Sequence, residues 1–336
     1  MATSLISLAS LHPLPRYLHE DQDEATPESK DLMSTLRREN GWVLTHLYQY
    51  QGFWHTTRQL QGVLASQTLF HAQPTDLFLV TTPKSGTTWL KAMAYSLVNR
   101  VQSPDFDNHP LLSHNPHDLV PFLELKLYVD NNVPDFTNSL HPRLFSTHMP
   151  YNSLPDSVVN SKCKVVYLCR NPGDTFISLW HFANKLRPKT LGDLSLEEAF
   201  KRFCRGVSLY GPYWDHVLGY WKKSQEKPEN ILFLKYEEIK EEPQVHLRRL
   251  AEFLGCPFSS KEEEEGAVEK ILKLCSFENL SNLEVNKNGK LSSGEENNAF
   301  FRRGEVGDSV NYLTVEMMEH LNWISEEKFK GCGLKF

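Results

Sequence analysis

A lysine, a glycine and several hydroxyl residues stand together in the string Thr81-Thr82-Pro83-Lys84-Ser85-Gly86-Thr87-Thr88. An apolar run, residues 77–80, precedes this string, and apolar residues at helical spacing follow it. A strand, a glycine-containing loop and a helix N-terminus direct several free backbone N–H groups at one point, which favours phosphate. The lysine adds a full positive charge, and the hydroxyl groups add hydrogen-bond donors. The string therefore predicts a phosphate-binding loop.

This loop is P-loop-like in composition, but its register differs from that of a nucleoside-triphosphate P-loop. That motif places lysine directly after its second glycine and Ser or Thr directly after the lysine, where the hydroxyl holds magnesium. Here Lys84 precedes Gly86. We therefore expect a phosphate site that works without a metal. The alternative is an ordinary turn between a strand and a helix, with Lys84 as a surface residue.

A histidine ends the apolar run Arg143-Leu144-Phe145-Ser146-Thr147-His148. In open α/β sheets, ligands bind at the carboxyl ends of the strands, which is where this run places the imidazole. With an unperturbed pKa of about 6.5, imidazole is the usual group for removing a proton near neutral pH. His148 is therefore the candidate general base. The alternative is a histidine that is only hydrogen-bonded within a loop.

An arginine ends a further apolar run, residues 164–169, and a turn follows it. Asp174 is a candidate N-cap for the next helix, and Ser178 lies about one turn into that helix. The Ser178 hydroxyl can therefore face the same crevice as Arg170. An arginine with a hydroxyl makes a good phosphate grip. A surface ion pair of Arg170 is the alternative.

Adjacent arginines, Arg302 and Arg303, stand before Gly304 and after a polar stretch that contains two glycines. Such a pair is either a surface charge pair or a clamp that closes on an anion. The flexible approach favours a lid. We expect residues 286–304 to form a lid over the cofactor.

The apolar runs that end at these groups alternate with helical segments. This alternation predicts an α/β fold of one domain, with a central parallel sheet flanked by helices on both faces. Residues 1–38 lack a pattern and are expected to form a flexible N-terminal arm, which leaves 39–336 as the domain. The segment 103–121 is rich in proline and is expected to be a loop. Helical patterns occur at 59–70, 196–204, 214–221 and 245–254.

Composition and charge exclude several classes of protein. The 336 residues carry a formal net charge of −6, which argues against a nucleic-acid partner bound by phosphate neutralisation. The six cysteines show no pair or histidine partner at zinc spacing, so free thiols in a reducing compartment are expected. No apolar window approaches the ~20 residues that a membrane span needs, and the start lacks a secretion signal. We expect a cytoplasmic protein that binds neither membrane nor metal.

Three strings resemble motifs of the cytosolic sulfotransferases, which transfer sulfonate from 3′-phosphoadenosine-5′-phosphosulfate (PAPS) to an acceptor hydroxyl or amine. Residues 83–90 resemble the family's 5′-phosphosulfate loop, residues 167–178 its 3′-phosphate motif, and residues 300–308 its C-terminal cofactor motif. The similarity covers about residues 40 to 330. The segment 115–121 and Ser146 resemble the plant soluble branch, which includes flavonol, hydroxyjasmonate and brassinosteroid sulfotransferases.

The resemblance implies roles for individual residues. His148 would remove the acceptor proton while Lys84 neutralises the bridging oxygen. Phe53 and Trp54 would lie near the acceptor, and the 275–277 string would form an edge of the adenine pocket. Two separate phosphate grips explain a nucleotide with phosphates at its 5′ and 3′ positions. The implied cofactor-binding residues are Lys84, Ser85, Gly86, Thr87, Thr88, Trp89, Arg170, Ser178, Tyr236, Arg302, Arg303 and Gly304.

Three positions depart from the family pattern. Many animal members have a lysine where Ser146 stands, so charge stabilisation must rest more on Lys84 and the loop amides. Ser309 stands in place of a tryptophan after Gly-Asp. Val310 stands in place of a lysine of the animal dimer motif, although Glu319 is retained. We therefore expect a monomer or a weak homodimer.

The expected function is metal-free transfer of sulfonate from PAPS to a hydroxyl of a small hydrophobic acceptor, such as a flavonoid, another phenolic, a steroid or a hydroxyjasmonate. Two alternatives belong to other classes. One is a non-catalytic module that binds the adenosine bisphosphate nucleotide. The other is a small-molecule kinase that uses ATP and magnesium, which the register of the loop disfavours.

Overall fold

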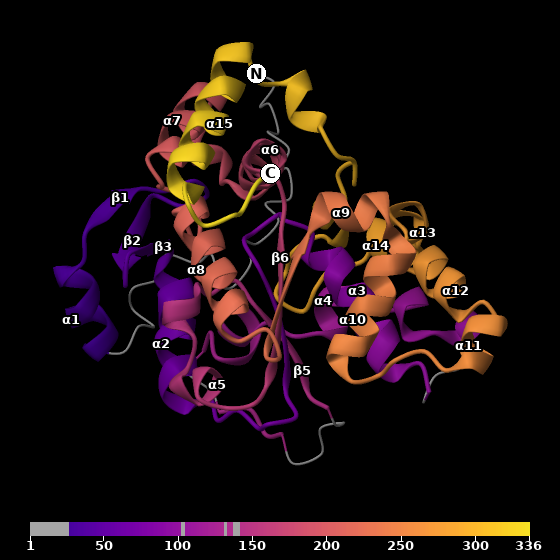
Figure 1. The fold of residues 1–336 in the computed structure, drawn as a ribbon. Helices are drawn as coiled ribbons and strands as arrows, with labels where there is room; N and C mark the ends of the chain where they lie inside the picture. The colour runs from indigo at the N-terminus through magenta and orange to yellow at the C-terminus, as the bar shows by residue number, and fades with distance from the viewer. Residues whose placement is uncertain (1–26, 102–104, 131–132, 137–141) are drawn as a thin grey trace, which may run out of the picture.

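A parallel sheet of four strands, ordered β5-β4-β6-β7, forms the centre of the computed structural model, which describes residues 27–101, 105–130, 133–136 and 142–336 (Figure 1). The strands are β4 (Leu77–Thr81), β5 (Leu144–Thr147), β6 (Lys164–Cys169) and β7 (Ile231–Lys235). All three pairings are parallel, and β4 lies between β5 and β6. The predicted α/β class with a central parallel sheet is confirmed.

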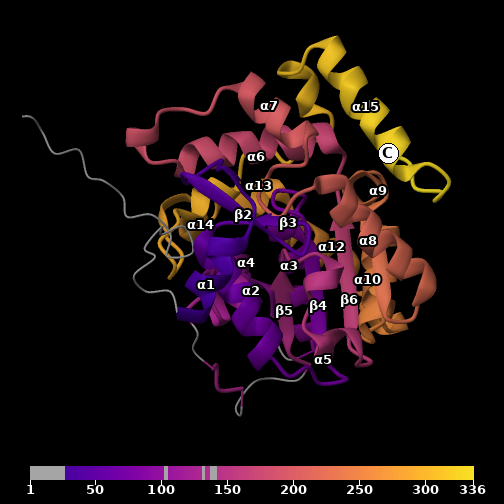
Figure 2. The same ribbon diagram turned by 90° about the vertical axis from the view of Figure 1, so that its left-hand side faces the viewer.

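Helices cover both faces of this sheet, and a small antiparallel sheet lies beside it (Figures 1 and 2). The small sheet has strands β1 (Arg38–Asn40), β2 (His46–Tyr50) and β3 (Phe53–His55). The α-helices are α1 (Pro27–Thr35), α2 (Thr57–Leu69), α3 (Thr87–Asn99), α4 (Pro116–Leu119), α5 (Asp156–Val159), α6 (Pro172–Leu186), α7 (Leu196–Cys204), α8 (Tyr213–Glu226), α9 (Tyr236–Glu241), α10 (Pro243–Leu254), α11 (Ser260–Glu264), α12 (Ala267–Leu274), α13 (Phe277–Asn282), α14 (Glu284–Asn288) and α15 (Val315–Phe329). Shorter helical turns are η3 (Phe106–Asn108), η4 (Pro110–Leu112), η5 (Leu123–Leu127), η6 (Tyr151–Ser153), η7 (Lys189–Leu191), η8 (Asn297–Phe300) and η9 (Asp308–Asn311).

Alternate side chains of each central strand enter two separate apolar layers. In β4, Phe78 and Val80 face the layer that contains residues of α2, α6 and α8. Leu77 and Leu79 face the opposite layer, with residues of α3, α10 and α12. Figure 1 shows α2 and α8 on one side of the sheet and α3, α10 and α12 on the other. Burial on both faces explains why the strands read as continuous apolar runs in the sequence.

Two expectations about ordering need correction, and the stretch expected to form a lid holds regular structure. The predicted flexible arm, residues 1–38, is too long, because residues 27–35 form α1 and Arg38 begins β1; residues 1–26 lie outside the described part of the chain. The predicted loop 103–121 contains the turns η3 and η4 and helix α4. The stretch 286–304 holds the end of α14, a bridge between Lys290 and Glu296, and η8.

All six cysteines, which belong to the described residues, are free, as expected, and Cys163 and Cys169 are buried. Among the described helices, none combines the length and the apolar character that a bilayer crossing requires.

A buried ion pair joins the beginnings of β4 and β5. Arg143 donates to both carboxylate oxygens of Asp76, from Nε to Oδ1 at 2.7 Å and from Nη2 to Oδ2 at 2.5 Å. Asp76 also accepts the backbone N–H of Gln73. The pair therefore fixes the ends of two strands whose other ends carry the phosphate loop and His148.

We expect Asp76→Asn to lower the free energy of unfolding by about 3–5 kcal/mol, because it leaves the Arg143 guanidinium buried without a countercharge. The matched control is Glu226→Gln, which breaks the exposed Lys223–Glu226 pair and should cost less than about 1 kcal/mol. Chemical denaturation of both variants measures the difference. Equal losses would contradict the role given to the buried pair.

Candidate active site

The four parallel strands end at one edge of the sheet, and each end delivers part of the site. The loop 82–86 follows β4, His148 follows β5, Arg170 follows β6, and Tyr236 follows β7. These residues, together with residues of helix α6, the segment 300–304 and other elements, line one cavity of about 340 Å³. The ligand-binding edge expected for an open α/β sheet is therefore where the candidate residues converge.

The phosphate loop is held in an unusual backbone conformation. Lys84 and Gly86 both have positive φ, 68° and 106°. Gly86 is the N-cap of α3, and a Cβ at this position would lie 2.8 Å from the Tyr236 ring and 3.0 Å from Leu168. The loop therefore requires glycine both for its backbone angle and for close packing against Leu168 of β6 and Tyr236 at the start of α9.

Hydrogen bonds between buried hydroxyl groups hold this loop in its conformation. Ser85 is fully buried and its Oγ lies 2.5 Å from Thr82 Oγ1. Thr87 Oγ1 lies 2.6 Å from Thr81 Oγ1. Ser85 does not line the cavity, unlike Lys84, Thr87 and Trp89. Its side chain supports the loop, so any contribution of Ser85 to anion binding would come from its backbone.

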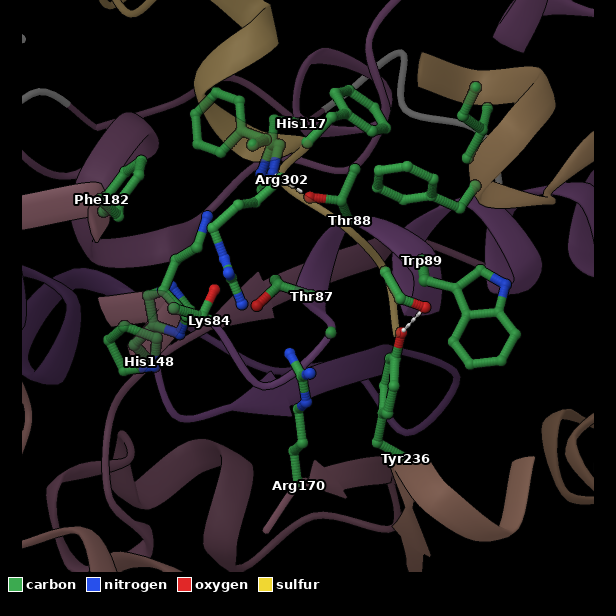
Figure 3. Close-up of a pocket in the computed structure, with 18 of the residues that line it drawn as sticks. Lys84, Thr87, Thr88, Trp89, His117, His148, Arg170, Phe182, Tyr236 and Arg302 are labelled. Atoms are coloured by element: carbon green, nitrogen blue, oxygen red, sulfur yellow. Dashed lines mark hydrogen bonds between the residues drawn. The ribbon is translucent and has the colours of Figure 1, made fainter. Parts of the chain in front are cut away.

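Lys84 points its amine into the cavity beneath two aromatic rings (Figure 3). Its Nζ lies 4.2 Å from the centre of the Phe182 ring and 5.7 Å from that of Phe300. Burial, followed by the positive charges of Arg302, Arg170 and Lys185, lowers the pKa of Lys84 to about 7. An anion bound next to the Lys84 amine therefore stabilises its charged form and raises its pKa.

His148 is fixed in orientation by its backbone and by its ring. Its Nδ1 lies 2.7 Å from the carbonyl oxygen of Thr81 and therefore carries the ring proton in the neutral form. Its backbone N–H donates to Glu124 at 2.8 Å. Burial lowers the pKa of His148 to about 3, although the bond to Thr81 opposes this shift. The imidazole is therefore neutral near pH 7, with Nε2 unprotonated.

Three arginines also line the cavity, and Figure 3 shows Arg302 beside Lys84 and Arg170 farther away. Arg170 Nη2 donates to Asp174 at 3.1 Å and to the carbonyl of Glu305 at 2.5 Å, and its guanidinium lies 4.7 Å from the centre of the Tyr236 ring. Arg302 and Arg303 both pair with Asp308. The Nε atoms of Arg170 and Arg302 are buried and have no hydrogen-bond partner among the described residues. Two buried donors therefore remain for an anion.

Asp174 does not act as the N-cap that the sequence suggests. Asn171 caps α6, accepting the N–H of Asp174 at 2.8 Å. The Asp174 carboxylate instead accepts the backbone N–H groups of Gly307 and Ser309, at 2.8 and 2.9 Å. Both residues can cap a helix, so the sequence pattern does not separate them. Asp174 consequently ties the C-terminal segment to Arg170.

An aromatic recess lies between the loop and the arginines. Trp89 and Tyr236 contact each other edge to face, with ring centres 5.3 Å apart. Tyr236 donates its hydroxyl to the carbonyl of Gly304 at 3.0 Å, the bond drawn in Figure 3. Gly304 has φ 68°, and a Cβ there would lie 2.5 Å from the Phe277 ring. These flat surfaces suit a planar base.

Of the residues predicted at the site, all but Ser85, Phe53 and Trp54 line the cavity. The predicted residues that line the cavity are Lys84, Gly86, Thr87, Thr88, Trp89, His148, Arg170, Ser178, Tyr236, Arg302, Arg303 and Gly304. Phe53 and Trp54 were expected near the acceptor, and neither lines the cavity. Phe53 packs against His216, and Trp54 lies in the core.

Sequence reasoning missed several residues of the site. Glu124 is fully buried and holds both the His148 backbone and the Thr147 hydroxyl. Burial raises the pKa of Glu124. His117 belongs to the segment 103–121, which was expected to be a loop, and it lies in the cavity wall. A glutamate inside the apolar segment 119–127 is the signal that could have drawn attention to position 124.

Among the described residues, no cluster of histidine, cysteine, aspartate or glutamate is arranged to hold a metal ion.

We expect Gly86→Ala to lower the free energy of unfolding more than Gly52→Ala. Both glycines have positive φ, so both variants carry backbone strain of about 1 kcal/mol. Only at position 86 does the new methyl group meet Tyr236 and Leu168, whereas position 52 is open. Chemical denaturation should show an additional loss of about 1–3 kcal/mol for Gly86→Ala. Equal losses would contradict the tight packing of the loop.

Comparison with known proteins identifies the family to which this arrangement belongs. The sequence profile of the family described as "Sulfotransferase domain" matches residues 74–333. Cytosolic sulfotransferase 12 of Arabidopsis thaliana is 49% identical over 331 residues, which cover 98% of this chain and 99% of the relative. Cytosolic sulfotransferase 6 of the same plant is 50% identical, over 94% of this chain and 96% of the relative.

Solved structures agree with the sequence comparison. An Arabidopsis thaliana putative steroid sulphotransferase has a TM-score of 0.74 and 43% identity, over 96% of this chain and 100% of that one. A mouse sulfotransferase complexed with PAP has a TM-score of 0.66 and 27% identity, over 85% of this chain and 95% of that one. The chain therefore belongs to the sulfotransferase family and is similar in sequence to its plant cytosolic members over nearly its full length.

Proposed function

We propose that this protein transfers sulfonate from PAPS to a hydroxyl group of a small hydrophobic acceptor, with His148 as general base. The observation that carries the proposal is the placement of Lys84, His148 and Arg170 around one cavity, since each comes from a different strand end. A lysine and an arginine on opposite faces of the sheet would have been unable to hold one donor.

The residues around the cavity fit a nucleotide with two phosphate groups. Lys84 and the N-terminus of α3 suit one anionic end, and the arginines suit the other. The buried Nε atoms of Arg170 and Arg302 supply unused donors. The recess at Trp89 and Tyr236 suits adenine. The crystal structure of the mouse relative with PAP supports the same class of ligand.

When bound, PAPS would supply an activated sulfonate, so the residues have three tasks. His148 Nε2 accepts the proton of the acceptor hydroxyl as the new sulfur–oxygen bond forms. The old sulfur–oxygen bond breaks with its electron pair on the phosphate oxygen, and Lys84 stabilises that charge. Glu124 and Thr81 hold the imidazole in orientation, through the backbone and through Nδ1. Neither a metal nor a covalent intermediate on the protein is required.

Apolar side chains around His148 favour a hydrophobic acceptor. The part of the cavity wall nearest to the imidazole includes Phe122 and Tyr210, with ring centres 4.7 and 5.4 Å from that of His148. Flavonoids, other phenolics, steroids and hydroxyjasmonates all combine apolar surface with a free hydroxyl, and they form the acceptor panel that we propose to test. Further apolar residues of the cavity wall include Val43, Leu125, Phe182, Leu186, Leu209 and Phe300.

The compartment and the assembly state belong to the same proposal. The Arabidopsis relatives are named cytosolic, and the enzyme proposed here would act in the cytosol. Val310, in place of the lysine of the animal dimer motif, favours a monomer or a weak homodimer. The stretch 286–304 contributes Leu291, Glu295 and Phe300 to the cavity wall, which supports its role as a lid over the donor.

Incubation with radiolabelled PAPS, the acceptor panel and EDTA tests the reaction directly. The proposal expects labelled product in the presence of EDTA. A kinase would label product only from ATP with magnesium, and a nucleotide sensor would bind adenosine 3′,5′-bisphosphate without transferring label to any acceptor.

We expect His148→Ala to lower kcat by about 10²- to 10⁴-fold, because the acceptor loses its proton acceptor. The affinity for adenosine 3′,5′-bisphosphate should stay within about threefold of the wild type, since the Lys84 and arginine grips are intact. His114→Ala, which removes an exposed histidine outside the cavity wall, should leave kcat unchanged. Undiminished turnover of His148→Ala would contradict the assigned base.

The affinity for adenosine 3′,5′-bisphosphate should fall as pH rises from 7 to 9. Lys84 has a pKa of about 7 without ligand, and the bound phosphate raises it, so binding takes up a proton above pH 7. This linkage predicts a loss approaching tenfold in affinity per pH unit. Titration calorimetry in buffers of different ionisation enthalpy measures both the affinity and the proton uptake.

Lys84→Met is the control for this pH dependence. It should bind weakly, with an affinity that no longer changes between pH 7 and 9. The same slope in the wild type and in Lys84→Met would exclude Lys84 as the titrating group.

A further inference from the structure

Lys91 of helix α3 is fully buried beneath the phosphate loop. No carboxylate lies within ion-pair distance of its amine among the residues that the structure describes. Its Nζ lies 3.0 Å from His117 Nδ1 and 3.4 Å from the centre of the Phe122 ring. A buried amine without a direct countercharge is costly and therefore calls for a functional explanation.

His117 connects this lysine to the cavity. The Nε2 atom of its ring lies 2.9 Å from Thr88 Oγ1. Phe122 and Phe300 hold the ring, with centres 5.5 and 4.3 Å away. Thr88 stands in the cavity wall, next to the loop that carries Lys84 (Figure 3). Lys91, His117 and Thr88 thus form a continuous hydrogen-bonded chain from the protein interior to the anion site.

The direction of the hydrogen bonds in this chain follows from the charge on Lys91. An ammonium group can only donate, so His117 Nδ1 must then accept, and the ring proton must lie on Nε2. His117 Nε2–H in turn donates to Thr88 Oγ1. The hydroxyl hydrogen of Thr88 is then free to point into the cavity. With the opposite tautomer, Thr88 would donate its hydroxyl hydrogen to His117 Nε2 and could only accept hydrogen bonds from a ligand in the cavity.

An anion in the cavity favours the charged form of Lys91. Burial lowers the pKa of Lys91 well below its usual value, and the nearby Glu124 carboxylate opposes this shift. The charged groups that act on the Lys91 amine are Glu124, Lys126, Asp118 and Glu295, and His117 contacts it directly. Negative charge added by a ligand acts in the same direction as Glu124. The anionic ligand that favours charged Lys91 is also the ligand that accepts a hydrogen bond from the Thr88 hydroxyl.

We propose that Lys91 and His117 are positioning residues that turn the Thr88 hydroxyl hydrogen toward the anionic donor. This inference rests on the proposed function, because it deepens how the same site holds PAPS. Ser146 stands where many animal members have a lysine, and its hydroxyl donates to the carbonyl of Pro121 at 3.2 Å. In this proposal Lys91, inside helix α3, supplies part of the charge stabilisation that Ser146 does not give.

The tautomer of His117 provides a direct test. Protein labelled with ¹⁵N-histidine and saturated with adenosine 3′,5′-bisphosphate should show the His117 ring proton on Nε2, with His117→Phe used to assign the signal. Lys91→Met should abolish this preference. A ring proton on Nδ1 in the wild type, or an unchanged tautomer in Lys91→Met, would overturn the proposal.

A double-mutant cycle tests whether Lys91 acts through Thr88. Lys91→Met and Thr88→Val should each weaken binding of adenosine 3′,5′-bisphosphate by about tenfold, in line with the loss of one hydrogen bond to a charged group. The double variant should be no weaker than about the worse single variant. An additive loss of about a hundredfold would overturn the relay and leave only a packing role.

Two further variants keep this test independent of folding. Lys164→Met removes another lysine that lies over an aromatic ring, 5.3 Å from the centre of Phe253 and remote from the cavity, and it should leave the affinity unchanged. His117→Phe keeps the ring between Phe122 and Phe300 but breaks the relay. If Lys91→Met does not fold, His117→Phe and Thr88→Val complete the same cycle.

The binding and tautomer measurements do not need turnover. If no acceptor receives sulfonate, the proposed function is contradicted, whereas the relay can still be confirmed by the binding and tautomer measurements. Transfer by the wild type together with additive losses in affinity would sink the relay alone.

Discussion

The parallel pairing of β4 with both β5 and β6 is the constraint on which the site depends. Because the three strands run in the same direction, the residues that follow them appear at the same edge of the sheet. The register pairs Val80 with Thr147 on one side and with Tyr167 on the other. A shift of one residue would reverse which side chains face each apolar layer, so the two cores on either face fix the register. The positions of Lys84, His148 and Arg170 follow from it.

Around this frame, charges are placed so that most have a partner before any ligand arrives. Asp174 and Asp308 hold the arginines, and backbone groups of the C-terminal segment close on Asp174. Lys84 has aromatic rings as its nearest neighbours instead of a carboxylate. The arginines are therefore oriented in advance, whereas the lysine depends on the ligand for its charge. The difference suits a site in which one end holds the nucleotide and the other end reacts.

The sequence predicted the strands and most of the site because both depend on local signals. Apolar runs bounded by polar residues mark strands that are buried on both faces, and the chemistry-bearing residues stand directly after these runs. Glu124 and Lys91 could not be predicted from local signals, because the partners that give them their roles, His148 and His117, come from other segments of the chain. Asn171 and Asp174 compete for the same cap, and Phe53 and Trp54 have the composition of a binding wall but serve the core. Tertiary packing decided each of these cases.

The cavity draws its two halves from different parts of the chain. Apolar wall residues such as Val43, Leu125 and Leu209 stand before position 210, whereas Lys84, Arg170 and Tyr236 stand at strand ends and residues 300–304 come from the C-terminal part of the chain. Substitutions in the first group can reshape the acceptor wall while the arginines and their aspartates stay in place. If the proposed function holds, such a division would let evolution change the acceptor by exchanging a few wall residues while the donor half stays intact.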